Sequence, residues 1–598
     1  MQGPPSTLLD VQAIAATLRG GKATDKWVHS WLPDTCAAPE QFFDALYAYA
    51  LSKRKGAKSR RGLVYDFYHD LVVANLDQRT PALFARDGAG YVPISYATLH
   101  ERCTALAGAW KRLGCERGKS ICVVLPVGVE HAVAVLTGLR MGLVITTLEP
   151  YGPAFVRSRL EALSPAFVVT SERVATAIRL PIAGALPAID GAREAVCPVC
   201  GSLCAAPAGA LPVVARAREG GAPPVASYSP DAPVLKLLSP FGADAEPVEI
   251  TAGALHASLL RDGLVVLGLE ASDVLAAPGF DPMQTSPHLL LTALASGACY
   301  AAIDAPDLEG DPKLAERARL SVLGMDCELR ERILARGADW FLATGRAWFK
   351  DLSRVLDVER WDELARVLAG KKLPGFNVFV NAATGGVELF SPRATSPVCL
   401  RAWPVPGRAF QLSEVAAGDL SALNDVGVYT VMDGEESAEL PLPRMLLAAR
   451  GDGYLFVGAI DLGPDAQVYP CAEVARVASR LPAVRHASVV LGPGRLMNDA
   501  RTVLVVFTDD ARGPDGRIEL PVTIPEIKSW IGAEMGERFV PERIAIYPLR
   551  PRLVDGVIDE AWCRSQFLSG SLDAMARSET FVLLSRIGYI LAGGAPGE

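Results

Sequence analysis

The sequence lacks an excess of basic residues. It has 59 Lys and Arg against 67 Asp and Glu, a formal net charge of −8. Because nucleic-acid-binding domains neutralise phosphates with clustered basic side chains, a globally basic nucleic-acid binder is excluded. Cysteine is also scarce, at 12 in 598 residues, which is too few for a disulfide framework. Half of the residues are hydrophobic, so the chain can bury several cores and is not wholly disordered.

Long apolar runs are absent as well. The best candidate for a membrane span, residues 132–148, is interrupted by Arg140, and a span needs roughly 18 apolar residues. The first residues, Met1 to Pro5, do not show the basic head and apolar stretch of a secretory signal. We therefore expect a cytoplasmic protein with mostly reduced thiols and no membrane span.

Changes in pattern along the chain predict four parts. Residues 1–62 form a helical extension that ends in a Lys- and Arg-rich linker. Residues 63–458 alternate strands and helices, which predicts a large α/β domain with a Cys-containing insertion at 190–232. Residues 459–567 form a smaller domain, and residues 568–598 form a C-terminal tail. The apolar end of this tail would pack on the protein or dock a partner or membrane surface.

Six segments resemble, in order, motifs of one family. They are residues 139–150, 279–281, 294–298, 429–433, 452–461 and 481–490. Together these segments resemble the adenylate-forming superfamily of acyl-CoA synthetases, nonribosomal-peptide adenylation domains and luciferases, over roughly residues 63–567. The resemblance implies a large domain of two α/β subdomains plus a β subdomain, and a small, mobile α+β C-terminal domain. It also implies joining of a carboxylate to ATP, followed by transfer of the acyl group to a thiol.

The segment that corresponds to the family's phosphate loop departs from the family pattern. Residues 238–249 keep Gly242, but Val248 stands at the lysine position and Phe241 at a hydroxyl position. Asp244, Glu246 and Glu249 place negative charge where the triphosphate would lie, and like charges repel. We therefore expect weak binding of ATP and Mg²⁺, or none.

Three further elements of the family's chemistry are altered, and one is kept. Thr384 matches the element that precedes the Mg²⁺-binding glutamate, but Gly385 occupies the glutamate position. Asp433 matches the ribose-binding aspartate. Near the C-terminus, Val557 stands where the resemblance implies a catalytic lysine. Ala459 replaces the arginine of the interdomain motif, so the resemblance implies a fold whose adenylation chemistry is degenerate.

A ligand pocket is implied around Phe280, Asp281, Met283 and His288. In peptide-type adenylation domains the aspartate of this segment meets the substrate's amino group, so an acyl or aminoacyl ligand is a candidate here. The alternative is that Phe280 belongs to the hydrophobic core and that His288 caps a helix.

A separate motif lies in the insertion. Cys197, Cys200 and Cys204 resemble a zinc knuckle, in which Cys-Pro-x-Cys-Gly directs thiolates at the metal. Tetrahedral Zn²⁺ takes four ligands, so a fourth would come from elsewhere. Free cysteines in a loop or a redox pair are the alternatives.

Three functions follow from these observations and remain open, of which a metal-dependent or redox module on this fold is the third. The first is a catalytically degenerate adenylate-forming protein that acts by binding, as a scaffold or accessory subunit with protein partners. The second is an active acyl- or aminoacyl-adenylating ligase with a rewired nucleotide site.

Overall fold

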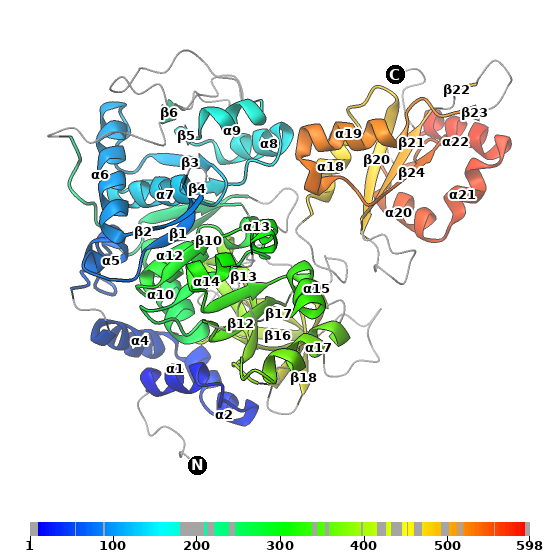
Figure 1. Ribbon diagram of the computed structural model, residues 1–598. Coiled ribbons are helices and arrows are strands. Elements are labelled where there is room, and N and C mark those ends of the chain that lie inside the picture. Colours follow the sequence, from blue (N-terminus) through cyan, green and yellow to red (C-terminus); the bar gives the residue numbers. More distant parts are fainter. Residues whose placement is uncertain are drawn as a thin grey trace.

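A computed structural model describes most of the chain. The described residues are 10–53, 56–87, 90–179, 209–211, 221–238, 246–311, 313–337, 344–352, 358–395, 399–414, 426–431, 445–450, 453–459, 469–491, 502–509, 511–512, 518–554 and 557–592. Two sheets make up the main body, and a smaller unit at the C-terminal end lies beside helix α8 (Pro153–Leu163), as Figure 1 shows.

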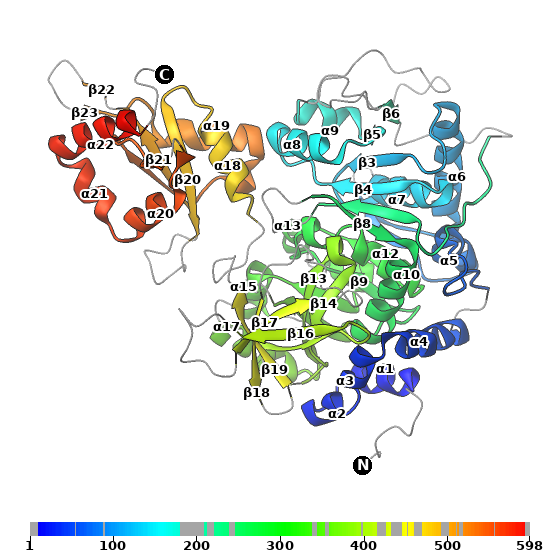
Figure 2. The same cartoon turned by 180° about the vertical axis from the view of Figure 1, so that it is seen from behind.

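The chain begins with four helices, which are α1 (Val11–Arg19), α2 (Asp25–His29), α3 (Leu32–Ala37) and α4 (Pro39–Lys53). Val11, Ile14, Ala15 and Leu18 are buried, and their helical spacing explains why α1 packs by one face. Figure 2 shows these helices beside α10 (Ala252–Arg261).

Part of the basic segment at the end of the extension is bound to the rest of the protein. The backbone N–H groups of Lys58 and Ser59 donate to the Asp70 carboxylate, at 2.6 Å and 3.0 Å. Arg61 forms ion pairs with Glu40 and Asp44 on α4. These contacts join the N-terminal helices to the start of the large domain.

The first sheet has six strands, ordered β6-β5-β3-β4-β7-β8. Every neighbouring pair is parallel except β7–β8. The strands are β3 (Ser120–Val124), β4 (Val144–Leu148), β5 (Phe167–Val169), β6 (Gly209–Leu211), β7 (Pro233–Leu237) and β8 (Val248–Thr251). The helices of this unit are α5 (Phe67–Leu71), η1 (Val73–Asn75), α6 (Tyr96–Arg112), α7 (Val129–Met141), α8 and α9 (Glu172–Ala177). After α7 the chain turns through Gly142, whose φ of +76° is left-handed and favours glycine.

The second sheet has 13 strands, ordered β16-β17-β18-β19-β15-β14-β13-β12-β11-β9-β10-β1-β2. The run from β1 through β10, β9, β11 and β12 to β13 is parallel, and the strands beyond it pair antiparallel. Its parallel run and its edge consist of β1 (Leu83–Asp87), β2 (Gly90–Ile94), β9 (Val274–Ala276), β10 (Cys299–Ala302), β11 (Val322–Met325), β12 (Ala347–Asp351) and β13 (Gly375–Asn381). The antiparallel extension consists of β14 (Gly386–Phe390), β15 (Arg401–Pro404), β16 (Phe410–Glu414), β17 (Val426–Val431), β18 (Met445–Arg450) and β19 (Gly453–Ala459).

The helices that follow the first sheet in sequence accompany this second sheet. They are α10, η2 (Asp262–Val266), α11 (Pro282–Thr285), α12 (His288–Ala295), α13 (Ala305–Gly310), α14 (Lys313–Ala318), α15 (Cys327–Arg336), α17 (Val358–Ala369) and η3 (Ala382–Thr384).

The small C-terminal unit is built on a three-stranded sheet, ordered β20-β21-β24. Its strands are β20 (Val484–Leu491), β21 (Thr502–Thr508) and β24 (Arg543–Tyr547), with short pairs β22 (Ala511–Arg512), β23 (Ile518–Glu519), β25 (Leu553–Val554) and β26 (Val557–Ile558). Its helices are α18 (Cys471–Ala478), α19 (Ile524–Met535), η5 (Glu537–Phe539), α20 (Glu560–Leu568), α21 (Ser571–Ala576) and α22 (Glu579–Leu591). A capping box between Thr523 and Glu526 begins α19.

The predicted fold class is confirmed: two α/β units, a β extension and a small α+β unit. Within the described residues, no helix is both long and apolar enough to cross a bilayer. Of the nine cysteines that the structure describes, seven are buried.

The N-terminal helices are attached to the β extension by a close aromatic contact. Phe42 on α4 is fully buried, and a Cβ added to Gly407 would lie 2.6 Å from its ring and 2.9 Å from the ring of Phe43. Gly407 also has a φ of +72°, so a larger residue would be strained there as well. This contact places α4 against the loop that follows β15.

Removing the buried ring should weaken this attachment. We expect Phe42→Ala to lower the free energy of unfolding by about 3–5 kcal/mol, the range for deleting a buried phenylalanine. Phe43→Ala, at a half-buried neighbour, is the matched control and should cost less. Urea unfolding of the two variants measures the difference, and equal losses would contradict the packing described.

Candidate functional site

A large cleft of about 1010 Å³ lies between α4, α10, β8 and the loop after β13. Four of the positions singled out in the sequence meet there: Val248, Glu249, Thr384 and Gly385. Val248 is half-buried on β8, and Thr384 ends the short helix η3. The structure therefore brings the lysine position and the glutamate position of the family motifs to one cavity.

The glutamate position offers no ligand for a cation. Gly385 has a φ of +92°, and a Cβ added there would meet nothing within 4 Å, so the position faces open space. Glu388, three residues on, is fully buried. Its carboxylate accepts a hydrogen bond from the Thr384 hydroxyl at 2.6 Å and pairs with Arg408, whose Nε donates at 3.2 Å. Glu388 therefore acts as a buried structural acid, whose pKa burial raises.

The arginines that line the described part of this cleft already have carboxylate partners. Arg61 pairs with Glu40 and Asp44, and Arg408 pairs with Glu388. Arg261 donates from Nε to the Asp262 carboxylate at 2.7 Å. Glu249 adds an exposed carboxylate to the cleft lining. A polyphosphate entering this part of the cleft would meet cations that are largely neutralised.

His288 belongs to a buried ionic network beneath the cleft. Its Nε2 lies 2.7 Å from Asp262 Oδ2, and the same oxygen accepts a hydrogen bond from the Val387 N–H at 2.9 Å. Arg261 completes the network by donating from Nη2 to the Val387 carbonyl at 2.8 Å. Burial alone would raise the pKa of Asp262, but the Arg261 guanidinium and the hydrogen bond with His288 hold it below its usual range.

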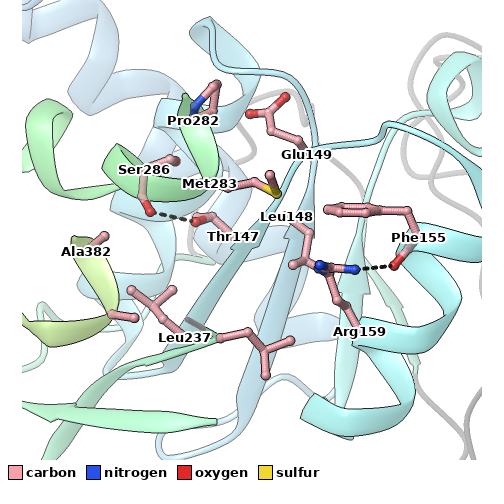
Figure 3. A pocket seen from close by; sticks show the side chains of 12 residues that line it. Thr147, Leu148, Glu149, Phe155, Arg159, Leu237, Pro282, Met283, Ser286 and Ala382 are labelled. Atoms are coloured by element: carbon pink, nitrogen blue, oxygen red, sulfur yellow. Dashed lines mark hydrogen bonds between the residues drawn. The ribbon is translucent and has the colours of Figure 1, made fainter. Parts of the chain in front are cut away.

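A second, much smaller cavity lies on the other side of the loop after β13. It is lined by Thr147, Leu148, Glu149, Phe155, Arg159, Leu237, Leu238, Pro282, Met283, Ser286, Ala382 and Ala383, and it holds about 30 Å³. We call it the small pocket. Figure 3 shows Met283 reaching into it between Glu149 and Leu148. A volume of this size accepts one or two water molecules, so an acyl or aminoacyl ligand requires the walls to separate.

Asp281 lies at the edge of the small pocket and contacts the small C-terminal unit. Its carboxylate accepts a hydrogen bond from Arg538 Nη2 at 2.6 Å, and it caps α11 by accepting from the Met283 N–H at 3.0 Å. The Tyr151 hydroxyl lies 3.4 Å from the same carboxylate and 2.5 Å from Arg538 Nη1. In this arrangement the guanidinium of Arg538, a residue of the same chain, forms an ion pair with Asp281.

The remaining predicted residues lie apart from one another. Phe280 packs against Phe349, with ring centroids 5.1 Å apart, and lines another cavity of about 60 Å³. Val557 is 70% exposed on β26. The positions outside the described residues are Phe241, Gly242, Asp244, Asp433, Cys197, Cys200 and Cys204. Among the residues that the structure does describe, no group of three or more His, Cys, Asp or Glu side chains is placed to hold a metal ion.

Among the residues that line the small pocket, Glu149 has a strongly raised pKa. Burial raises the pKa of its carboxyl group to about 8, and the neighbouring Asp281 adds to the increase while Arg538 opposes it. A carboxyl group of this kind holds its proton at neutral pH.

Several of these residues carried no signal in the sequence. Arg538 lies more than 250 residues from Asp281 along the chain, and nothing in its local pattern distinguishes it from a surface arginine. The Arg261–Asp262 pair lies inside an ordinary amphipathic stretch. Glu149 and Tyr151 do fall in or beside a segment that resembles the family, which is the signal that would have drawn attention to them.

The comparison with known families covers part of the chain. Residues 73–233 match the model of the family described as AMP-binding enzyme. The acetyl-coenzyme A synthetase of Halorhodospira halophila is 35% identical over 80 residues, which cover 13% of this chain and 12% of that relative. That of Alkalilimnicola ehrlichii is 32% identical over 80 residues, with the same coverage of both chains. The matched segment is thus only a small part of the length of these relatives.

Solved structures match over most of the chain. Acetoacetyl-CoA synthetase from Streptomyces lividans aligns with a TM-score of 0.58 at 18% identity, covering 98% of this chain and 97% of that one. A double mutant of o-succinylbenzoate CoA synthetase from Bacillus subtilis aligns with a TM-score of 0.59 at 13% identity, covering 84% and 98%. An artificially fused adenylation–PCP di-domain from Klebsiella oxytoca gives 0.58 at 15% identity, covering 80% and 93%.

These matches define the class of fold, which is that of acyl-CoA synthetases and adenylation domains. Residues 73–233 match the AMP-binding family model, and the likeness to these solved structures shows the fold that the resemblance implies.

The raised pKa of Glu149 predicts a specific pH dependence. The folded protein binds one more proton than the unfolded chain between the usual glutamate pKa of 4.5 and about 8, so stability falls as pH rises through that window. Glu149→Gln removes this contribution and should gain stability relative to the parent protein from pH 5 to pH 8. Urea unfolding at several pH values measures it. Glu161→Gln, at an exposed position of α8, should follow the parent profile, and identical profiles for both variants would contradict the prediction.

Proposed function

We propose that this protein is a catalytically degenerate adenylate-forming-fold protein that acts through binding. The observation that carries the proposal is the large cleft, where Val248 and Gly385 face the cavity in place of a lysine and a carboxylate. Mg²⁺ in phosphate sites is held by one or two carboxylates together with the phosphates. The carboxylate near this position, Glu388 on β14, is already bonded to Thr384 and Arg408.

The ligand and the partner belong to the same proposal. A cleft of about 1010 Å³ is large enough for an adenosine-type or acyl ligand without a triphosphate. Its N-terminal wall, with Phe43 and Tyr47, adds aromatic surface to the adenylate-forming fold. We place the protein in the cytoplasm as an accessory or scaffold subunit with a protein partner.

The second candidate is an active acyl- or aminoacyl-adenylating ligase with a rewired nucleotide site. The observation in its favour is the alignment with acetoacetyl-CoA synthetase, which extends over 98% of this chain. Such a ligase would require cations from elsewhere to neutralise the triphosphate.

Nucleotide binding separates the two candidates. We expect calorimetry with MgATP to show no binding in the micromolar range, because the described cleft pairs its arginines with carboxylates. Pyrophosphate exchange with a panel of carboxylic acids should stay at the blank. AMP and adenosine serve as controls, since they lack the triphosphate. Exchange with any acid would establish the ligase.

Restoring the lysine should not restore turnover. Val557 is 70% exposed, so Val557→Lys is compatible with folding. One donor in a preorganised site is typically worth about 2.7–4 kcal/mol, but here the triphosphate is not positioned for it to act on. We expect pyrophosphate release by Val557→Lys to equal that of the parent protein. Release above this level would show that the nucleotide site is intact.

Zinc remains a proposal that rests on the cysteine motif. We expect the purified protein to contain up to one equivalent of zinc, held in part by Cys197, Cys200 and Cys204. Cys197→Ser and Cys200→Ser should each lower the zinc content measured by elemental analysis. Cys399→Ser, at a buried free cysteine, is the control. Metal-free protein from zinc-replete medium would contradict the proposal.

A further inference from the structure

The contact between the large domain and the small C-terminal unit is unusually close at one point. A Cβ added to Gly152 would lie 2.5 Å from the backbone of Met535 and 2.6 Å from that of Glu534. On the other side, a Cβ added to Gly536 would lie 2.8 Å from the Tyr151 carbonyl oxygen. Two glycines, one from each unit, thus let the main chains touch. No other residue type fits at either position without separating the two units.

Two ion pairs flank this backbone contact. In one of them the small unit supplies the arginine, and in the other the large domain supplies it. From the small unit, Arg538 donates to Asp281, whose side chain is only 3% exposed. From the large domain, Arg159 donates to Glu473 through Nη1 at 2.6 Å and Nη2 at 3.1 Å, and the two side chains are 12% and 10% exposed. The Arg538 side chain is 37% exposed, but Asp281 and both members of the Arg159–Glu473 pair are largely shielded from water. Loss of Arg538 therefore leaves a poorly solvated carboxylate at Asp281.

An aromatic cluster fills the space between the ion pairs. Phe539 of the small unit stacks on Phe155, with ring centroids 5.5 Å apart, and meets the Tyr151 ring edge-on at 5.2 Å. The Arg538 guanidinium lies over the Tyr151 ring at 4.7 Å. Tyr151 therefore contacts both the charged and the apolar part of the small unit.

These interdomain contacts act directly on the walls of the small pocket. Phe155, which Phe539 covers, lines one wall. Asp281, which Arg538 holds, caps the helix α11 that supplies Met283 to the opposite wall. Both walls are therefore tied to consecutive residues of the small unit.

We propose that Arg538 is a latch: by binding Asp281 it fixes the small C-terminal unit against the large domain and keeps the small pocket closed. The proposal concerns how the two units are held together, and it is independent of whether the large cleft binds nucleotide. With the latch closed, no ligand larger than a few atoms enters the small pocket. Opening requires Arg538 to leave the Asp281 carboxylate, whose side chain is only 3% exposed.

Hydrogen exchange and scattering test the latch on the full chain. In Arg538→Met, which keeps the apolar stem and removes the charge, we expect amide exchange in residues 151–156 and 283–286 to accelerate at least tenfold. The radius of gyration from X-ray scattering should increase. Arg538→Lys keeps the charge but loses the paired hydrogen bonds. Its amide exchange rates should therefore lie between those of the parent protein and those of Arg538→Met. Arg485→Met removes an arginine that pairs with Asp509 within the small unit, and it should behave as the parent.

Asp281→Asn weakens the same ion pair from the large domain. Because it leaves the sequence of the small unit unchanged, it tests the latch even if Arg538→Met misfolds that unit. It should accelerate exchange in residues 535–540, and the double variant with Arg538→Met should be no faster than the faster single variant. Parent-like exchange and scattering in both single variants would overturn the proposal. That outcome would show that the backbone and aromatic contacts alone hold the units together.

Discussion

The buried carboxylate of Asp262 is the interaction on which the centre of this molecule depends. It holds Arg261, His288 and the Val387 N–H in one fully buried network, and so joins α10, α12 and β14. A buried charge is stable only while its partners stay in place, and removal of one partner typically costs about 3–5 kcal/mol. Among the elements that line the large cleft, α10 is thereby fixed to β14, the strand that follows the loop after β13.

This network also explains why glycine stands at position 386, directly after the loop that follows β13. A Cβ on Gly386 would lie 2.2 Å from the His288 ring and 2.4 Å from the Asp262 carboxylate, so only glycine fits. Gly386 has a φ of +121° and Gly385 a φ of +92°, which side chains seldom adopt. The loop that carries a metal-binding glutamate in the family is here shaped around a buried ion network.

Local sequence patterns predicted the elements of the fold well. Helices α7 (Val129–Met141) and α19 (Ile524–Met535) and strands β21 (Thr502–Thr508) and β24 (Arg543–Tyr547) follow from patterns within their own segments. Their apolar periodicity and their capping residues are local properties that a sequence displays directly. The 13-stranded sheet could not be predicted in this way, because it pairs β1 with β10, more than 200 residues later. Such pairings depend on tertiary contacts that no local pattern records.

The candidate site likewise has features that the sequence identified and features that only the structure shows. The altered motif positions Val248, Thr384 and Gly385 could be identified from the sequence, because the resemblance supplied an order and a spacing to compare. Their meeting in one cleft required the structure. The contacts of Asp281 could not be foreseen at all, since its partner is an arginine in another domain whose neighbours in sequence give no indication of the contact.

The glycine pair at Gly152 and Gly536 has a consequence for how the two units can move. A contact between main chains has no flexible side chain to absorb a partial displacement. A small rotation would break the backbone contact, the aromatic stacking and both ion pairs nearly together. Docking of the small unit is therefore expected to be cooperative, with a docked and an undocked population and little between them. Intermediate interdomain distances should be nearly unpopulated in a single-molecule measurement.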